Sequence, residues 1–345
     1  MNKNYDVYTW FWDNEKDKLC WNSVRDRNTY LFFRQKLCIL LKNGKEQFSK
    51  IIFSKEYRKE NGGKIYLKDE LESLYNILEN IANQNLEKIP KYSCLIKITF
   101  KLKKAYVSKD DETFYPCNPI VKDKVFKIPM VRPSTWKGTL RYSAIKVFEE
   151  EFDENTWKEK RLIMIRLFGN EKEVIENYLN SFISSKTNKK YEEIKEEFRN
   201  FLSDKGYINN DIDSKMGRVI LYPTFFNEIS LDVITPLDRR TRTPVKNKAP
   251  IYFELVPKGT VGKFKLLYYP FDLISKGEFD KIEKESKEDL EFLTKALNKM
   301  FFEIGFSAKK SSGFGVIEPL TTKDIEIKHN NLNLDTKTLL KFLCS

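Results

Sequence analysis

Residues 128–141 read Ile-Pro-Met-Val-Arg-Pro-Ser-Thr-Trp-Lys-Gly-Thr-Leu-Arg and have the pattern of a strand that leads into a helix. Lys137 and Arg141 are four residues apart, which places both cations on one face of that helix. The first N–H groups of a helix lack carbonyl partners and therefore attract anions. The stretch predicts a phosphate-binding helix, to whose contacts we add Arg132 and Ser134 at its start.

Gly138 lies between the two cations. A glycine inside a helix costs about 1 kcal/mol relative to alanine. Its presence is better explained if a ligand packs directly on the helix than if the face is only solvated, although the solvated face stays the alternative. For Trp136 we favour packing in the core over stacking on a base.

A second glycine-marked segment covers residues 305–316 and reads Gly-Phe-Ser-Ala-Lys-Lys-Ser-Ser-Gly-Phe-Gly-Val. It lacks the spacing of a P-loop, and its Gly-x-Gly precedes a strand instead of opening a helix, so nucleotide-binding motifs of the P-loop and Rossmann types are excluded. Two interpretations remain. The glycines serve a tight connection, or they form a backbone cradle for a ligand with the residues Lys309, Lys310, Gly313 and Gly315.

Together the two segments resemble the RAMP superfamily of CRISPR-associated proteins. In that family a Ser-rich turn, Lys-Gly and Arg open the first core helix, and a glycine-rich loop follows the second. The resemblance spans roughly residues 92–320, is strongest at 117–141 and 305–318, and leaves 1–90 unmatched. It favours the cradle over the tight connection.

The hydrophobic pattern along the chain predicts an α+β fold with an RRM-like (ferredoxin-like) core, and the resemblance implies that this is a RAMP core. Apolar residues alternate with polar ones over 92–107, as in a half-buried strand. Further strands are expected at 218–226, 229–234, 251–256 and 263–269, and helices at 68–86, from the Trp-Lys-Gly stretch to 152, and at 285–303. The order strand, helix, strands, helix, strand is that of a ferredoxin-like sheet.

We divide the chain accordingly. Residues 1–90 are an aromatic and helical N-terminal extension, 91–320 the core, and 321–345 a C-terminal tail. Within the core we expect a helical insertion at about 154–205, with a solvated connector at 184–190, and a basic hairpin at about 236–250.

The hairpin contains five Lys or Arg residues among the eleven residues 238–248. Such density suggests phosphate contacts. In RAMP backbone subunits a hairpin after a similar Asp-Arg signature projects as a thumb and wedges between bases of guide and target. The resemblance implies this role for the hairpin that follows Asp238, with Arg239, Arg240 and Arg242 as RNA contacts; an exposed charged hairpin is the alternative.

An acidic loop raises the question of catalysis. Asp110, Asp111 and Asp123 are candidates for binding Mg²⁺ and cleaving RNA. The run 117–123 resembles the loop of target-cleaving RAMP subunits, but Cys117 occupies the position of their aspartate. A thiol cannot supply that carboxylate, so the residues favour a binding protein over an enzyme. No metal or cofactor is expected, and Mg²⁺ enters only if the chain cleaves RNA.

The composition agrees with a polyanionic partner. Lys and Arg number 62 against 50 Asp and Glu, a net charge of +12, although genome composition or growth temperature also produces lysine-rich chains. His329 is the single histidine, which excludes a Ser-His-Asp triad and paired-histidine chemistry. The five cysteines lack zinc spacing. Without a signal peptide or a membrane-length apolar run, we expect a cytoplasmic protein with no membrane partner.

The resemblance implies that the chain holds guide RNA within a type III CRISPR effector complex. Its partners would be guide RNA and other effector subunits, with target RNA as a further candidate. Two alternatives stay open. One is a RAMP-type endoribonuclease that processes precursor guide RNA or cleaves target RNA, and the other is a structural subunit with little RNA contact.

Overall fold

The computed structural model describes residues 68–110, 118–207, 215–235 and 251–344, apart from 85, 87 and 127, together with 238, 240, 241 and 243. Most of the predicted extension, including its aromatic run at 5–12, lies outside these residues. So do Asp111 and Cys117 of the acidic loop and Arg239 and Arg242 of the basic hairpin.

Four antiparallel strands form the central sheet in the order β3-β7-β1-β8. Two helices connect them: α6 follows β1 and precedes β3, and α11 lies between β7 and β8. This order is that of the ferredoxin-like fold and confirms the predicted fold class. The bounds are β1 Ser93–Lys101, β3 Val219–Leu221, β7 Val261–Tyr268, β8 Ile325–Asn330, α6 Pro133–Glu150 and α11 Phe279–Lys299.

The prediction that residues 321–345 are only a C-terminal tail was wrong, because they contain a strand and a helix. Residues 325–330 form β8, which pairs with β1 so that Ile327 lies opposite Ile96 and His329 opposite Cys94. Helix α12 (Thr336–Leu343) follows and packs on α11, with Leu339 and Leu343 buried. An edge strand has one solvent-exposed side, so its polar residues Glu326, Lys328 and His329 hide the strand pattern.

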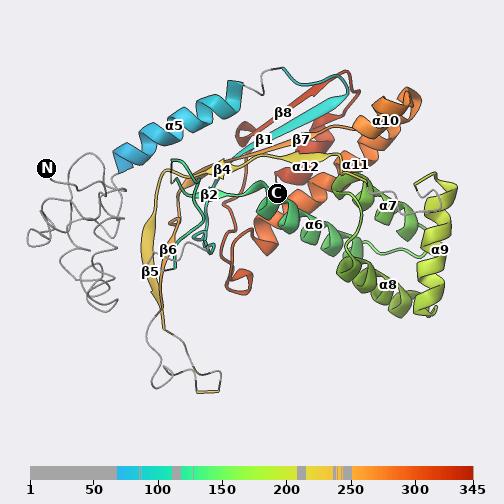
Figure 1. The fold of residues 1–345 in the computed structure, drawn as a ribbon, viewed down its shortest axis with the longest axis horizontal. Coiled ribbons are helices and arrows are strands. Elements are labelled where there is room, and N and C mark those ends of the chain that lie inside the picture. The colour runs from blue at the N-terminus through green and yellow to red at the C-terminus, as the bar shows by residue number, and fades with distance from the viewer. Residues whose placement is uncertain are drawn as a thin grey trace, which may run out of the picture.

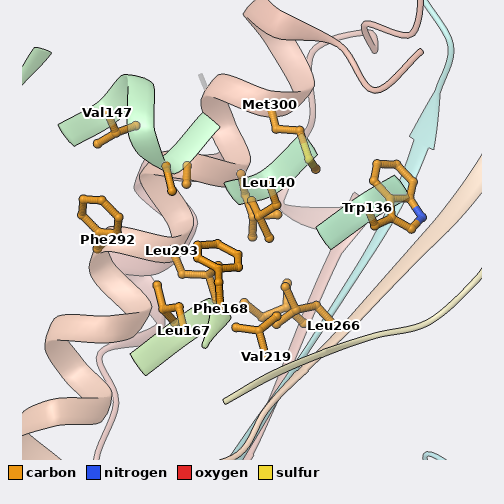
Figure 2. Packing of buried hydrophobic residues seen from close by; sticks show 14 of the residues in the cluster. Trp136, Leu140, Val147, Leu167, Phe168, Val219, Leu266, Phe292, Leu293 and Met300 are labelled. Atoms are coloured by element: carbon orange, nitrogen blue, oxygen red, sulfur yellow. The ribbon is translucent and has the colours of Figure 1, made fainter. Parts of the chain in front are cut away.

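The main core lies between the sheet and helices α6 and α11. Alternate residues of β1 and β7 point toward the helices, among them Ile96, Ile98 and Leu266, because side chains along a strand alternate between the two faces. Figure 2 shows Leu140 and Trp136 of α6 packed with Leu293 of α11 and with Met300 above Leu266. Met300 begins a π-helical turn, Met300–Ile304, which directly follows α11.

Three helices occupy the predicted insertion: α7 (Trp157–Phe168), α8 (Glu173–Thr187) and α9 (Tyr191–Asp204). Helix α8 continues to Thr187, so the connector expected at 184–190 is only the last three of those residues. One core cluster includes residues of the sheet, Leu167 and other residues of these helices, so the insertion shares its core with the sheet. The division of the chain into an extension, a core and a tail was a separate prediction, and it stays one.

The remaining elements lie around this frame. The strands β5 (Ser230–Ile234) and β6 (Ile251–Leu255) form a two-stranded ribbon that lies at the opposite end of the molecule from α7–α9 (Figure 1). Two short strands, β2 (Met130–Val131) and β4 (Thr224–Phe225), pair beside α6, and α10 (Phe271–Lys276) precedes α11. Among the described helices, none is both long enough and apolar enough to cross a membrane.

Helix α5 (Lys68–Gln84) covers part of the sheet face that α6 and α11 leave open. Lys265 points to this face, since its neighbours Phe264 and Leu266 belong to the helix side. Its ammonium is buried and lies 2.9 Å from the buried carboxylate of Glu79 in α5. A buried charge needs such a partner, so this pair fixes α5 on the sheet.

A buried network of charges ties the insertion to the core. Asp289 of α11 is fully buried and accepts hydrogen bonds from Arg166 of α7 at 2.8 Å, Arg218 at 2.9 Å and the Tyr268 hydroxyl at 2.8 Å. Arg218 also pairs with Asp272 of α10 at 2.7 Å. Burial raises the pKa of Asp289, and the two guanidinium groups oppose that effect. Asp289 is thus the fully buried carboxylate of a network that Glu285 also joins through contacts with both guanidinium groups.

We expect Asp289→Asn to destabilise the fold by about 3–5 kcal/mol, because it removes the fully buried counter-charge that both guanidinium groups contact. Urea unfolding measures the change. Glu288→Gln is the matched control: this carboxylate also pairs with Arg166 but is 41% exposed, and its loss should cost about 1 kcal/mol or less. Equal effects of the two substitutions would contradict a central role for Asp289.

Candidate nucleic-acid interface

The two motif segments meet in the core through a pair of aromatic side chains. Trp136, in the first turn of α6, is fully buried, and its ring centroid lies 4.4 Å from that of Phe306 in the glycine-rich segment. The Trp136 Nε1–H donates to Thr224 Oγ1 at 3.2 Å. The interpretation of Trp136 as a core residue is confirmed, and the contact holds the start of α6 beside the glycine-rich segment.

The outer face of α6 is bare around Gly138. This glycine is exposed, and a Cβ built on it would meet nothing within 4 Å in the described chain. Ser134, one turn earlier, is also exposed, and Lys137 is half-buried. Lys137 forms no ion pair with a described residue, and its pKa is lowered, first by burial and then by the neighbouring charge of Arg141. An uncompensated cation beside bare helix is suited to an anion.

Arg141 has a contact that sequence reasoning missed. Its Nη2 donates to the backbone oxygen of Phe168 at 2.6 Å, and its guanidinium lies 5.7 Å from the centre of that ring. Phe168 is the last residue of α7, where helical carbonyls lack partners. Arg141 thus stabilises the end of α7, and its predicted RNA contact stays a prediction for its remaining donors.

The glycine-rich segment folds back closely on itself. Gly305 and Gly315 have positive φ, 74° and 75°, and an added Cβ would lie 2.5 Å from the Phe314 oxygen and from Ser307 Cβ, respectively. Ser307 Oγ donates to the Val107 oxygen at 2.9 Å, which ties the segment to the chain after β1. Packing alone therefore explains these two glycines. Gly313 is half-buried and faces Lys104, whose Nζ donates to the Ser312 oxygen at 2.9 Å.

Lys309 and Lys310 reach in different directions from this loop. The Lys309 Nζ lies 5.3 Å from the ring centre of Phe253 in β6, and the Lys310 Nζ lies 5.3 Å from that of Tyr142 in α6. Lys309 itself has a left-handed backbone, with φ of 59°. The loop thus bridges the base of the ribbon and α6, and it brings Lys310 against Tyr142, one helical turn after the bare glycine.

The ribbon β5–β6 carries the basic hairpin at its end. Asp238 Oδ1 accepts the N–H groups of Arg240 at 2.8 Å and Thr241 at 3.0 Å, and these bonds lower its pKa. The Asp238 N–H donates to the Thr243 oxygen at 2.8 Å. The aspartate of the Asp-Arg signature therefore shapes a turn, and Arg240 is exposed next to it. RNA contacts of the hairpin stay a prediction.

The acidic loop is fixed to the ribbon by a buried ion pair. Lys122 Nζ lies 2.5 Å from Glu254 Oε2, and both side chains are almost fully buried. The same oxygen accepts the N–H of Ile120 at 3.1 Å. Lys122 belongs to the run that resembles the loop of cleaving subunits, but the structure gives it an anchoring role.

The described candidates for catalysis have partners of their own. Asp110 pairs with Arg132 at 3.3 Å, and Asp123 Oδ1 accepts the N–H groups of Val125 and Phe126 at 2.9 and 2.8 Å in a turn. In the described part of the chain, no three Asp, Glu, Cys or His side chains gather as metal ligands would. Arg132, predicted as an RNA contact, is thus half-buried beside a carboxylate.

The RAMP superfamily model matches residues 117–318. The chain belongs to this superfamily. The matched region contains the acidic loop from residue 117 on, α6, the insertion, the ribbon and the glycine-rich segment, whereas Lys104, Val107 and Asp110 precede it. The identification made from the Trp-Lys-Gly stretch and the glycine-rich segment is confirmed.

Among solved structures, the chain is similar to one in the cryo-EM structure of the Type III-B Cmr-beta bound to cognate target RNA. The two are 14% identical, the match covers 93% of this chain and 89% of the other, and the TM-score is 0.41. A search of curated protein sequences gave no match.

We expect Lys122→Met to destabilise the protein by about 3–5 kcal/mol, because it leaves the Glu254 carboxylate buried without its cation. The double variant Lys122→Met/Glu254→Gln removes both charges and keeps an acceptor for the Ile120 N–H, so it should be more stable than the single variant. Urea unfolding of both tests this. A single variant as stable as the wild type would contradict the anchoring role.

Proposed function

We propose that this chain binds guide RNA as a subunit of a type III CRISPR effector complex. Membership of the RAMP superfamily supports the general class. The observation that carries the proposal is the bare surface at Gly138, with Lys137 next to it on the same helix and with Lys310 of the glycine-rich loop 5.3 Å from the ring of Tyr142, one helical turn further along. Other effector subunits and target RNA would be further partners.

The electrostatics of this surface suit a phosphate chain. Neither Lys137 nor Lys310 has a carboxylate within ion-pair distance among the described residues, and partial desolvation lowers the pKa of each. A phosphate placed between them would supply the missing counter-charge. Bare helix allows the backbone of a nucleic acid to approach closely, and the net charge of +12 adds a long-range attraction.

In this proposal the protein grips the RNA backbone and does not read sequence. Selection of a target would come from base pairing with the guide, as in other RNA-guided systems. The basic hairpin at the end of the ribbon would position or separate bases. Mg²⁺ would be needed only if the chain also cleaved RNA, and the contacts of Asp110 and Asp123 give that second function no support.

The first prediction concerns charge. Lys137→Ala/Lys310→Ala should weaken binding of single-stranded RNA and lower the slope of log affinity against log salt by about 1.4, since each lost phosphate contact contributes about 0.7. Fluorescence anisotropy over a salt series measures both quantities.

The control is Lys158→Ala/Lys189→Ala, which removes the same charge. Both of these lysines pair with Glu197 in the insertion helices, away from the site. An unchanged affinity and slope in the test variant, or the same change in the control, would overturn the proposed grip.

A substitution at Gly138 distinguishes a surface that binds a ligand from one that is only solvated. Gly138→Ala should stabilise the free protein by about 0.5–1 kcal/mol, because alanine favours the helix and the new methyl has open space. The same methyl should weaken RNA binding, since it occupies the surface where the backbone would pack.

Asn200→Ala is the matched control. It also places alanine in an exposed helical position, in α9, and should leave RNA affinity unchanged. Thermal unfolding and anisotropy give the two readouts. If Gly138→Ala bound RNA as tightly as the wild type, the bare face would not be the contact surface.

A further inference from the structure

Tyr142 is an exposed aromatic residue on the outer face of α6. Tyr142 is 45% exposed, whereas Trp136 and Phe148 of the same helix are fully buried. Tyr142 follows Gly138 by four residues, so the two lie one turn apart on one face. The hydroxyl makes no hydrogen bond with a described residue, and core packing does not account for so large an apolar ring at the surface.

Two lysines lie against this ring. The Lys310 Nζ is 5.3 Å and the Lys146 Nζ 5.7 Å from its centre, both within the range of cation–π attraction. Lys146 also pairs with Glu149 at 2.7 Å. Lys310 has no such pair with a described carboxylate, so its positive charge is the one available to a ligand.

A pocket of about 300 Å³ opens beside the ring, lined by Tyr142, Glu303, Ile304 and Lys310. This volume is at the lower end of small-molecule sites. Glu303 is the one acidic member, and its carboxylate lies 2.7 Å from the Lys299 ammonium, which offsets its charge. The pocket therefore combines an aromatic face, an aliphatic side chain and a cation without a paired carboxylate.

We propose that Tyr142 stacks against one RNA base while Lys310 contacts the adjoining phosphate, so that the pocket beside the Tyr142 ring holds one nucleotide of the bound strand. Surfaces for single-stranded nucleic acid are built from such pairs of aromatic rings and cations. The inference rests on the proposed RNA binding and assigns the subsite at which a base is held.

The test compares oligoadenylate with an abasic RNA strand of the same length, which keeps the phosphates and lacks the bases. We expect wild-type protein to prefer oligoadenylate. Tyr142→Leu should lower affinity for oligoadenylate by about 5- to 150-fold, the range that one stacked base contributes, and leave affinity for the abasic strand unchanged. Tyr142→Phe should bind both strands as the wild type does.

Tyr178→Leu is the matched control. Tyr178 of α8 is 47% exposed and also lies near the Lys146 ammonium, 5.8 Å away, but it is not among the residues that line the pocket. This variant should bind both strands normally. Equal losses for the two strands in Tyr142→Leu, or none, would overturn the base subsite while leaving phosphate binding in place. Failure of the wild type to bind either strand would overturn the proposed function itself.

Discussion

The contact between Trp136 and Phe306 is the constraint on which the candidate site depends. The two residues are 170 positions apart in the chain, yet their ring centroids lie 4.4 Å apart. Phe100 of β1 and Phe301 of the π-helical turn after α11 belong to the aromatic cluster around them. Rings of this size bury a large apolar area and pack in few geometries. The first turn of α6 and the glycine-rich loop therefore have one relative position, in which Lys310 of the loop lies against Tyr142 of α6.

Two pairs of lysines differ in how the positive charge of each side chain is compensated. Lys122 and Lys265 are buried, and each has a glutamate within 2.9 Å. Lys137 and Lys310 are partly desolvated, and each lacks a paired carboxylate in the described chain. Burying charge is costly unless it is compensated. The first pair obeys that rule within the protein, and in the proposed function the phosphates of the RNA would compensate the second pair.

The sequence predicted the order of the ferredoxin-like sheet because buried strands alternate cleanly, as in the run around Ile96 and Ile98. It did not predict β8, where an edge position tolerates Lys328 and His329, so the alternation is masked. At the site, the two motif segments were found, but their outermost contacts were not. Tyr142 carries no local signal in the sequence, because its contact with Lys310 depends on how the fold places the glycine-rich loop. The sequence alone does not show that Arg141 donates to the end of α7, because that contact depends on the packing of the two helices.

The glycines show why such motifs cannot be interpreted by residue type alone. Gly305 and Gly315 have left-handed backbone and touch neighbouring atoms, so the fold requires them with or without a ligand. Gly138 has helical surroundings and open space, and alanine would suit the helix better. A residue that costs stability and serves no internal contact points to a requirement outside the described chain. Gly138 is therefore the glycine that points to a ligand, and the glycine-rich loop contributes by placing Lys310 against Tyr142 on the same helix.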